Sequence, residues 1–175
     1  MIQVVVALAV VVALLVAWVA TRPATFSLSR SVSVAAPAAA VYAHVADLHR
    51  WTAWSPWEGL DASLSRSYSG SAAGVGAAYE WQGNAKVGAG RMTIVDAREP
   101  AFVEIRLEFI RPWRATNRTT FSLRDVGGET EVTWSMSGAN TTMGKLMSLA
   151  VSMDRMVGGD FERGLAKLAA VAEGR

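Results

Sequence analysis

The chain has 175 residues, enough for one hydrophobic core of ordinary size plus a short additional segment. Its 17 Lys and Arg residues nearly balance 15 Asp and Glu residues, and this small, dispersed net charge argues against nucleic-acid binding, which uses a concentrated basic face. The absence of cysteine excludes disulfides, thiolate nucleophiles and cysteine-ligated metal sites.

Residues 2–20 form an apolar run without a charged side chain. A helix of this length spans about 28 Å, which matches the roughly 30 Å hydrocarbon core of a bilayer. A cleaved signal peptide is the alternative, but a cut after Ala20 would place bulky Trp18 where small residues are preferred. We therefore expect residues 1–22 to be a retained transmembrane anchor and residues 23–175 to form one soluble domain.

The sequence leaves the side of the membrane open. Arg22 and Arg30 follow the apolar run and no basic residue precedes it. The positive-inside rule would then keep the domain cytoplasmic, although two charges give only a thin bias.

A half-buried first strand is predicted after Pro23, where apolar residues alternate with serines. Its apolar positions are Phe26, Leu28, Val32 and Val34. Arg30 is the single charge on the apolar side. Pro37 then opens a short helix, and a second short helix is expected between Asp47 and Pro56.

Six further strands are predicted from alternating apolar residues and intervening turn signals. They are Leu64–Ser69, Ala77–Gln82, Gly90–Ala97, Phe102–Ile110, Thr116–Asp125 and Glu131–Ser137. Regular spacing with short turns indicates an antiparallel meander. Because one long helix follows the last strand, the fold class is α+β rather than a parallel β-α-β fold.

That long helix is predicted over Met143–Ala172, where apolar residues recur every three or four positions. They are Met143, Leu146, Ala150, Met153, Val157, Phe161, Leu165, Leu168 and Ala172. We expect this stripe to cover the apolar face of the sheet. Gly158 and Gly159 should loosen or kink the helix, with Asp160 capping a restarted second half.

The order of elements resembles the helix-grip fold of the SRPBCC superfamily, and local motifs resemble its polyketide cyclase/dehydrase and lipid-transport family. The motifs are SVSVAAP at 31–37, WTAWSPW at 51–57, GVG at 74–76, VTWSM at 132–136 and GDFE at 159–162. The resemblance covers residues 26–173. It implies a curved antiparallel sheet of about seven strands wrapped on the C-terminal helix, with a hydrophobic ligand held between them.

Residue patterns for catalysis or metal binding are weak. His44 and His49 lie five apart, which does not give the one-turn pair of a helical zinc site. The sequence has no Gly-x-Ser-x-Gly motif, and residues 70–76 lack the lysine of a phosphate-binding loop. We therefore expect no catalytic residues, no metal and no cofactor. Asp47 is interpreted as a helix cap, with ligand contact as the alternative.

Seven side chains are predicted to line an internal apolar pocket of roughly 300–1,000 Å³, the usual size of small-molecule sites. They are Trp54, Trp57, Tyr79, Trp81, Phe109, Trp134 and Met153. Arg66 and Tyr68 would add a guanidinium and a hydroxyl to this pocket. The alternative is that the aromatic residues simply fill the core, because large aromatics dominate cores as well as pockets.

Three functions remain open from the sequence. The first is membrane-tethered binding or transport of a hydrophobic small molecule or lipid by a monomer, attached through residues 2–20. The second is a cyclase/dehydratase-type enzyme acting in the same cavity, with Tyr79, Arg91 and Asp47 as candidates to move protons or hold charge. The third is a chaperone-binding domain that acts through an exposed surface.

Overall fold

The computed structural model describes residues 2–141, 144–145 and 153–175. Three helical elements precede most of the sheet: α1 (Ile2–Thr21), α2 (Ala38–Ala46) and the 3₁₀ helix η1 (Leu48–Ala53). The strands are β1 (Thr25–Val34), β2 (Ser65–Ser69), β3 (Ala78–Gln82), β4 (Ala89–Arg98), β5 (Phe102–Arg111), β6 (Ala115–Val126) and β7 (Glu129–Ala139). The chain ends with helix α4 (Met153–Ala172).

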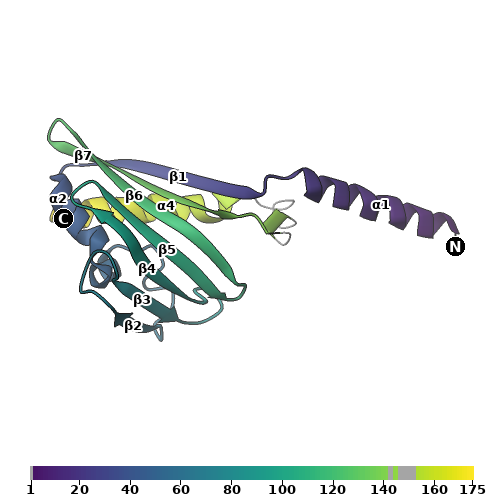
Figure 1. The fold of residues 1–175 in the computed structure, drawn as a ribbon, viewed down its shortest axis with the longest axis horizontal. Helices are drawn as coiled ribbons and strands as arrows, with labels where there is room; N and C mark the ends of the chain where they lie inside the picture. Colours follow the sequence, from purple (N-terminus) through teal and green to yellow (C-terminus); the bar gives the residue numbers. More distant parts are fainter. Residues whose placement is uncertain (1, 142–143, 146–152) are drawn as a thin grey trace.

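The seven strands form one antiparallel sheet in the order β1-β7-β6-β5-β4-β3-β2. All strands after β1 therefore follow as a meander, and β1 closes the series by pairing with β7 from Thr25↔Ala139 to Val34↔Thr130. Figure 1 shows the sheet curving around α4. The predicted helix-grip architecture is confirmed, and the predicted strands agree with the observed ones to within about two residues.

Helix α4 buries the predicted stripe at Phe161, Leu165 and Leu168. It packs mainly on β1, with further contacts to α2, β7 and η1. Three residues of that stripe, Met143, Leu146 and Ala150, lie outside the described part of the chain. The predicted restart of the helix after the glycines is wrong, because α4 continues as one helix through both glycines. Asp160 pairs with Arg163 one turn later instead of capping a new helix.

The two short helices begin and end near the predicted positions. Pro37 occupies the position before α2, and the Asp47 side chain accepts a hydrogen bond from the His49 backbone N–H at 2.9 Å. Asp47 therefore caps η1, as the first of its two interpretations predicted. The indole of Trp51 donates to the Val45 carbonyl at 3.0 Å, which ties η1 to the end of α2.

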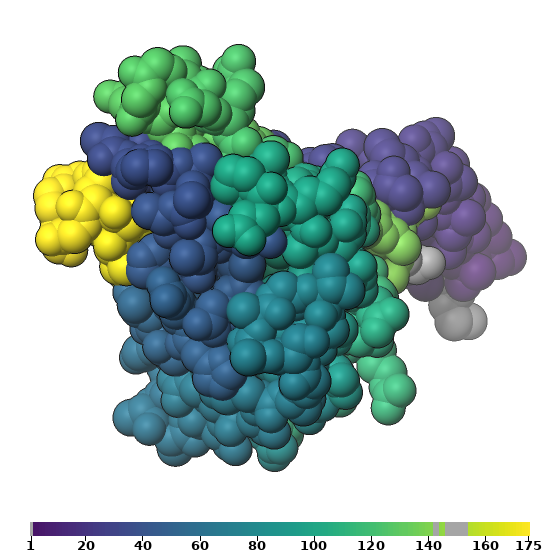
Figure 2. Space-filling view, turned by 60° about the vertical axis from the view of Figure 1, so that its left-hand side comes forward, coloured from purple at the N-terminus to yellow at the C-terminus, as the bar shows by residue number. Residues whose placement is uncertain are grey.

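Helix α1 extends away from the sheet, and none of its residues is buried (Figures 1 and 2). It is long and apolar enough to cross a membrane, a test that a signal sequence near an N-terminus also passes. The segment that joins it to β1 is held by Asn140, whose backbone N–H donates to the Ala24 carbonyl and whose side chain donates to the Pro23 carbonyl. The point where α1 leaves the sheet is therefore fixed by hydrogen bonds.

Candidate ligand-binding site

Cross-strand register defines the face of the sheet that is turned toward α4. One row of paired residues runs across all seven strands: Phe26, Gly138, Asn117, Leu107, Met92, Tyr79 and Tyr68. Directly paired residues in antiparallel strands project to the same side. This row of the inner face is apolar except for the Asn117 amide and the hydroxyls of Tyr68 and Tyr79. The neighbouring row passes through Leu28, Met136, Thr119, Ile105 and Ile94.

Two of the seven predicted pocket residues fill the core. Trp54 and Trp134 are 0% and 2% exposed, and their ring centroids lie 5.8 Å apart in an edge-to-face arrangement. Trp134 also stacks on Phe161 at 4.0 Å and on Phe121 at 5.0 Å. The density of these contacts gives both rings the packing role that the alternative interpretation described.

A second aromatic group lies on the inner face of β2, β3 and β5. Centroid separations are 5.1 Å between Tyr68 and Tyr79, 6.0 Å between Tyr79 and Trp81, and 6.0 Å between Trp81 and Phe109. The Trp81 ring lies over Gly90, where an added Cβ would come within 2.4 Å of it. Tyr79 is buried, whereas Trp81 and Phe109 are half-buried. These three predicted residues are therefore brought together at the side of the inner face farther from α4.

Trp57 extends the first aromatic group toward the surface. Its ring meets Trp134 at 5.8 Å and Phe161 at 6.5 Å, both edge to face, and the side chain stays half-buried. The side chain of Met153, the seventh predicted residue, lies outside what the structure describes. Six of the seven residues thus face the interior between sheet and helix, in two groups with different roles.

Three side chains place polar atoms on this largely apolar inner face. On this inner face, the Thr119 hydroxyl and the Trp134 indole N–H are buried with no hydrogen-bond partner among the described residues; Nδ1 of His44 on α2 is the third such atom. The Asn117 amide donates only to the Met136 sulfur, at 3.7 Å, in a space that Gly138 leaves free. Buried polar groups are normally paired, and an ordered water or a ligand oxygen would satisfy these groups.

Thr119 and Asn117 are the site residues that the sequence interpretation missed. A signal was present, because Thr119 alternates in phase with Phe121 and Leu123 in the predicted strand. A hydroxyl on the apolar phase of a central strand has to be paired or functional.

Titratable groups at this end of the sheet belong to β2, β3 and the segment before them. Burial raises the pKa of Tyr79 to about 12, and the Glu58 carboxylate adds to the effect. Burial also raises the pKa of Tyr68. Arg66 pairs with Glu58, whose side chain is largely covered. The phenols of Tyr68 and Tyr79 are therefore neutral hydrogen-bonding groups, and the Arg66–Glu58 ion pair lies beside them.

The three candidates of the enzyme interpretation do not converge on one site. Arg91 lies on the outer face, where it pairs with Glu80 across the strands at 2.9 Å. Asp47 is engaged in capping η1. Of the three, only Tyr79 faces the interior, so the enzyme alternative keeps one interior candidate. Within the ranges 2–141, 144–145 and 153–175, no cluster of three His, Asp or Glu residues is placed to hold a metal.

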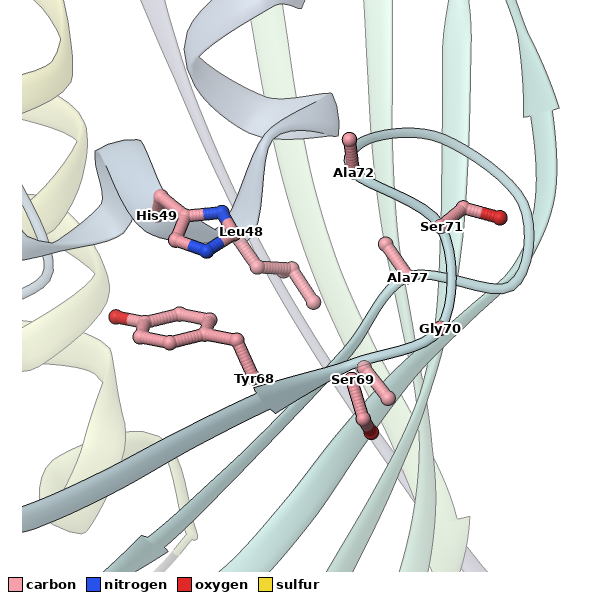
Figure 3. A pocket seen from close by; sticks show the side chains of 9 residues that line it. Leu48, His49, Tyr68, Ser69, Gly70, Ser71, Ala72 and Ala77 are labelled. Carbon is pink, nitrogen blue, oxygen red and sulfur yellow. The ribbon is translucent and has the colours of Figure 1, made fainter.

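Two hollows lie at the edges of this arrangement. One, of about 150 Å³, lies between η1 and the turn after β2, where the rings of His49 and Tyr68 stack at 4.0 Å (Figure 3). The other, of about 450 Å³, lies along the β5–β6 turn and is lined by Phe109, Ile110 and Arg114 among others. Phe109 is the one predicted pocket residue at these two hollows.

A seven-stranded antiparallel sheet curved around a C-terminal helix defines a protein of the SRPBCC type. Comparison with known proteins identifies the family within that type. Residues 25–173 match the family described as polyketide cyclase / dehydrase and lipid transport. The chain belongs to this family. The comparison with curated proteins gave no match.

Solved structures share the fold at low sequence identity. Protein CV1439 from Chromobacterium violaceum is similar with a TM-score of 0.60 and 16% identity, over 87% of this chain and 99% of that one. A second similar structure is the di-domain ARO/CYC BexL from the BE-7585A biosynthetic pathway, with a TM-score of 0.62 and 15% identity over 91% of this chain and 54% of BexL. The Aha1 dimer from Colwellia psychrerythraea is similar with a TM-score of 0.57 and 16% identity, over 85% of this chain and 96% of the Aha1 chain.

Proposed function

We propose that this chain binds a hydrophobic small molecule or lipid on the inner face of the sheet, beside α4. The observation that carries the proposal is the half-buried apolar surface of Trp81, Leu107 and Phe109 on the inner face of the sheet. Helix α4 packs mainly on β1, at the other edge of this face, and therefore leaves these three side chains partly uncovered. Apolar surface on the inside of a curved sheet favours an apolar ligand. The lipid-transport part of the family description supports the same class of ligand.

The polar atoms on this face add a second property to the ligand. The Thr119 hydroxyl can donate and accept, and the Asn117 amide has donors beyond its weak contact with sulfur. A ligand with an apolar body and a hydroxyl or carbonyl oxygen would satisfy these groups without introducing a charge. We therefore propose an uncharged amphiphile rather than a plain hydrocarbon.

The tether follows from α1 under the same proposal. A helix of 20 residues, all unburied, would hold the domain at a bilayer surface, where an amphiphile of this kind partitions. The tethered unit is proposed to be a monomer formed by residues 23–175. In the cyclase/dehydratase alternative, the same inner face would fold a reactive chain, and Tyr79 would be its interior candidate for proton transfer.

The proposal is tested by native mass spectrometry of the full chain extracted in mild detergent, which detects retained ligand directly. Thr119→Val removes an unpaired buried hydroxyl without changing shape, so the stability should stay equal or rise. Ligand retention should fall. Thr120→Val, one residue along β6 on the outer face, is the matched control and should retain ligand as the unmodified chain does.

A second variant tests the inner face by covering it with a larger side chain. Leu107→Trp places a large ring on the inner face next to Met92 and should reduce retention while the domain still unfolds cooperatively. Absence of retained ligand in the unmodified chain, or equal loss in both threonine variants, would contradict the proposal. A retained molecule that is chemically converted during incubation would instead support the enzyme alternative.

A further inference from the structure

The turn between β5 and β6 exposes an apolar and cationic tip. Trp113 is 59% exposed and Ile110 is 51% exposed, which is unusual for side chains of this size. Arg111 lies between them in the sequence and Arg114 follows Trp113, and the sequence from 109 to 118 contains no acidic residue. Within the described residues, no ion pair involves either arginine.

This tip lies at the end of the sheet from which α1 leaves. Phe26, near the start of β1, pairs with Gly138, which pairs with Asn117 near the start of β6. Only two and a half strand spacings separate β1 from the middle of the β5–β6 turn, or about 12 Å at 4.8 Å per strand. Figure 1 shows the turn and α1 on the same side of the sheet.

The connection between α1 and the sheet is too short to separate the two. Residues 22–24 span at most about 10 Å when extended. Arg22 lies over the Trp18 ring at 3.9 Å, an arrangement suited to the membrane–water boundary. Asn140 holds Pro23 and Ala24 against the end of β7. If α1 spans a bilayer, the tip is within reach of its surface.

Charge differs between the two ends of the sheet. Three connections at the α1 end, residues 21–24, 83–88 and 111–114, carry Arg22, Lys86, Arg111 and Arg114 and no acidic residue. The segment that enters β2 at the same end carries two carboxylates, Glu58, which pairs with Arg66, and Asp61, which accepts from the Asn84 backbone N–H. The opposite end includes the β6–β7 turn, where Asp125, Glu129 and Glu131 surround Arg124. The β3–β4 and β5–β6 turns are therefore the cationic part of the α1 end, and they suit an anionic lipid surface better than the acidic β6–β7 turn does.

We propose that the β5–β6 tip docks on the lipid bilayer that α1 spans, with Trp113 and Ile110 in the interfacial layer and Arg111 and Arg114 on anionic headgroups. Docking brings Phe109, and with it the apolar inner face, to the membrane surface. This inference rests on the tether of the proposed function. It adds an oriented domain, so that an amphiphilic ligand reaches the inner face from the bilayer without crossing water.

The experiment uses the full chain reconstituted in phosphatidylcholine vesicles with phosphatidylglycerol. Because the chain has no cysteine, one introduced cysteine carries a spin label at a single site. Thr116→Cys reports on the tip, and Val126→Cys is the matched control ten residues along β6, about 33 Å away at 3.3 Å per residue. Nickel-chelating lipid headgroups increase the relaxation rate of labels close to the surface.

We expect the relaxation enhancement at residue 116 to be several-fold larger than at residue 126. Adding Trp113→Ser, Arg111→Gln and Arg114→Gln should remove most of the difference, since each arginine near an anionic surface contributes about a fivefold factor to the docked population. Vesicles of phosphatidylcholine alone should lower the enhancement at residue 116. Equal enhancement at both labels, or no effect of the three substitutions, would overturn the inference.

Two further measurements separate this inference from the proposed function. Flotation with the vesicles tests whether α1 tethers the chain, and failure to float overturns both tether and docking. Native mass spectrometry of the same samples tests ligand retention. Retained ligand together with equal enhancement at residues 116 and 126 would leave the binding function standing and refute the docked orientation.

Discussion

The Arg30 side chain of β1 crosses α4 directly over Gly158. A Cβ added at Gly158 would lie 2.4 Å from Nη2 of Arg30. The guanidinium donates to Asp154 Oδ1 and Glu162 Oε1, each at 2.7 Å. These carboxylates lie one helical turn before and one turn after the glycine, so Gly158 makes the space through which one cation reaches both.

A comparison of the two adjacent glycines tests this role. Gly159→Ala should stabilise the protein by up to about 1 kcal/mol, because alanine is the better helix former and only the Arg163 tip lies near, at 3.5 Å. Gly158→Ala should gain less or lose stability, because Arg30 must move. Urea unfolding of both variants measures the difference.

Arg30→Met provides the control for that comparison. With the guanidinium removed, Gly158→Ala should recover the gain that Gly159→Ala shows, and the double-mutant cycle isolates the contact. Equal effects of the two glycine substitutions in the unmodified background would contradict the role given to Gly158.

The expected restart of α4 after its glycines shows that the sequence pattern does not reveal contacts between distant elements. Alternation in β1 identified Arg30 as the one charge on an apolar face, and the helical stripe identified Phe161. Neither pattern contains the register between β1 and α4, which decides that Arg30 meets Gly158. A glycine that makes room for a distant side chain looks locally the same as a glycine that breaks a helix. Gly164, placed against Trp134 and Pro56, is a second example.

The aromatic residues of the site show the same limit. Period-two alternation correctly placed Tyr79 and Trp81 on one face of β3, and the register then joined them to Phe109. Alternation could not distinguish the half-buried rings of Trp81 and Phe109 from the buried ring of Trp134, because the difference depends on how far α4 covers the sheet. Coverage is a property of packing between distant elements.

Phe161→Ala should destabilise the protein strongly. The ring is 1% exposed and stacks on Trp134 with an interplanar angle of 11°, so its removal leaves a cavity between two rigid elements. We expect a loss of about 3–5 kcal/mol in the free energy of unfolding. Met156→Ala, five residues earlier on α4 and 45% exposed, is the control and should change stability by less than about 0.5 kcal/mol.

Asp61 gives the protein a pH-dependent contribution to stability. Its carboxylate accepts hydrogen bonds from the hydroxyl and backbone N–H of Ser63 and from the backbone N–H of Asn84, and these hold its pKa below the usual value. Because the folded pKa is depressed, the contribution is full above the unfolded value of 3.8 and is lost as pH falls through the folded value.

Asp61→Asn should therefore lower the melting temperature at pH 7, where the amide nitrogen would face the Asn84 N–H donor. The difference from the unmodified chain should shrink once the pH falls below the unfolded value. Thermal unfolding followed by circular dichroism at several pH values checks this. A difference that is independent of pH would mean that the carboxylate charge is not what these donors stabilise.

Removal of residues 1–22 should leave a soluble, folded monomer. No residue of α1 is buried, and the cut falls before Pro23 and Ala24, so the hydrogen bonds from Asn140 to β1's entry segment are kept. Size-exclusion chromatography with light scattering should give the mass of one chain. Far-ultraviolet circular dichroism should show the mixed helix and strand content of the sheet with α2 and α4. A species with that spectrum that is nevertheless insoluble would show that α1 covers apolar surface of the domain, and a dimer would overturn the expected monomer.

Because the β5–β6 tip stays exposed after the cut, the shortened chain should still bind anionic vesicles weakly, and Trp113→Ser should abolish that binding while the spectrum stays unchanged.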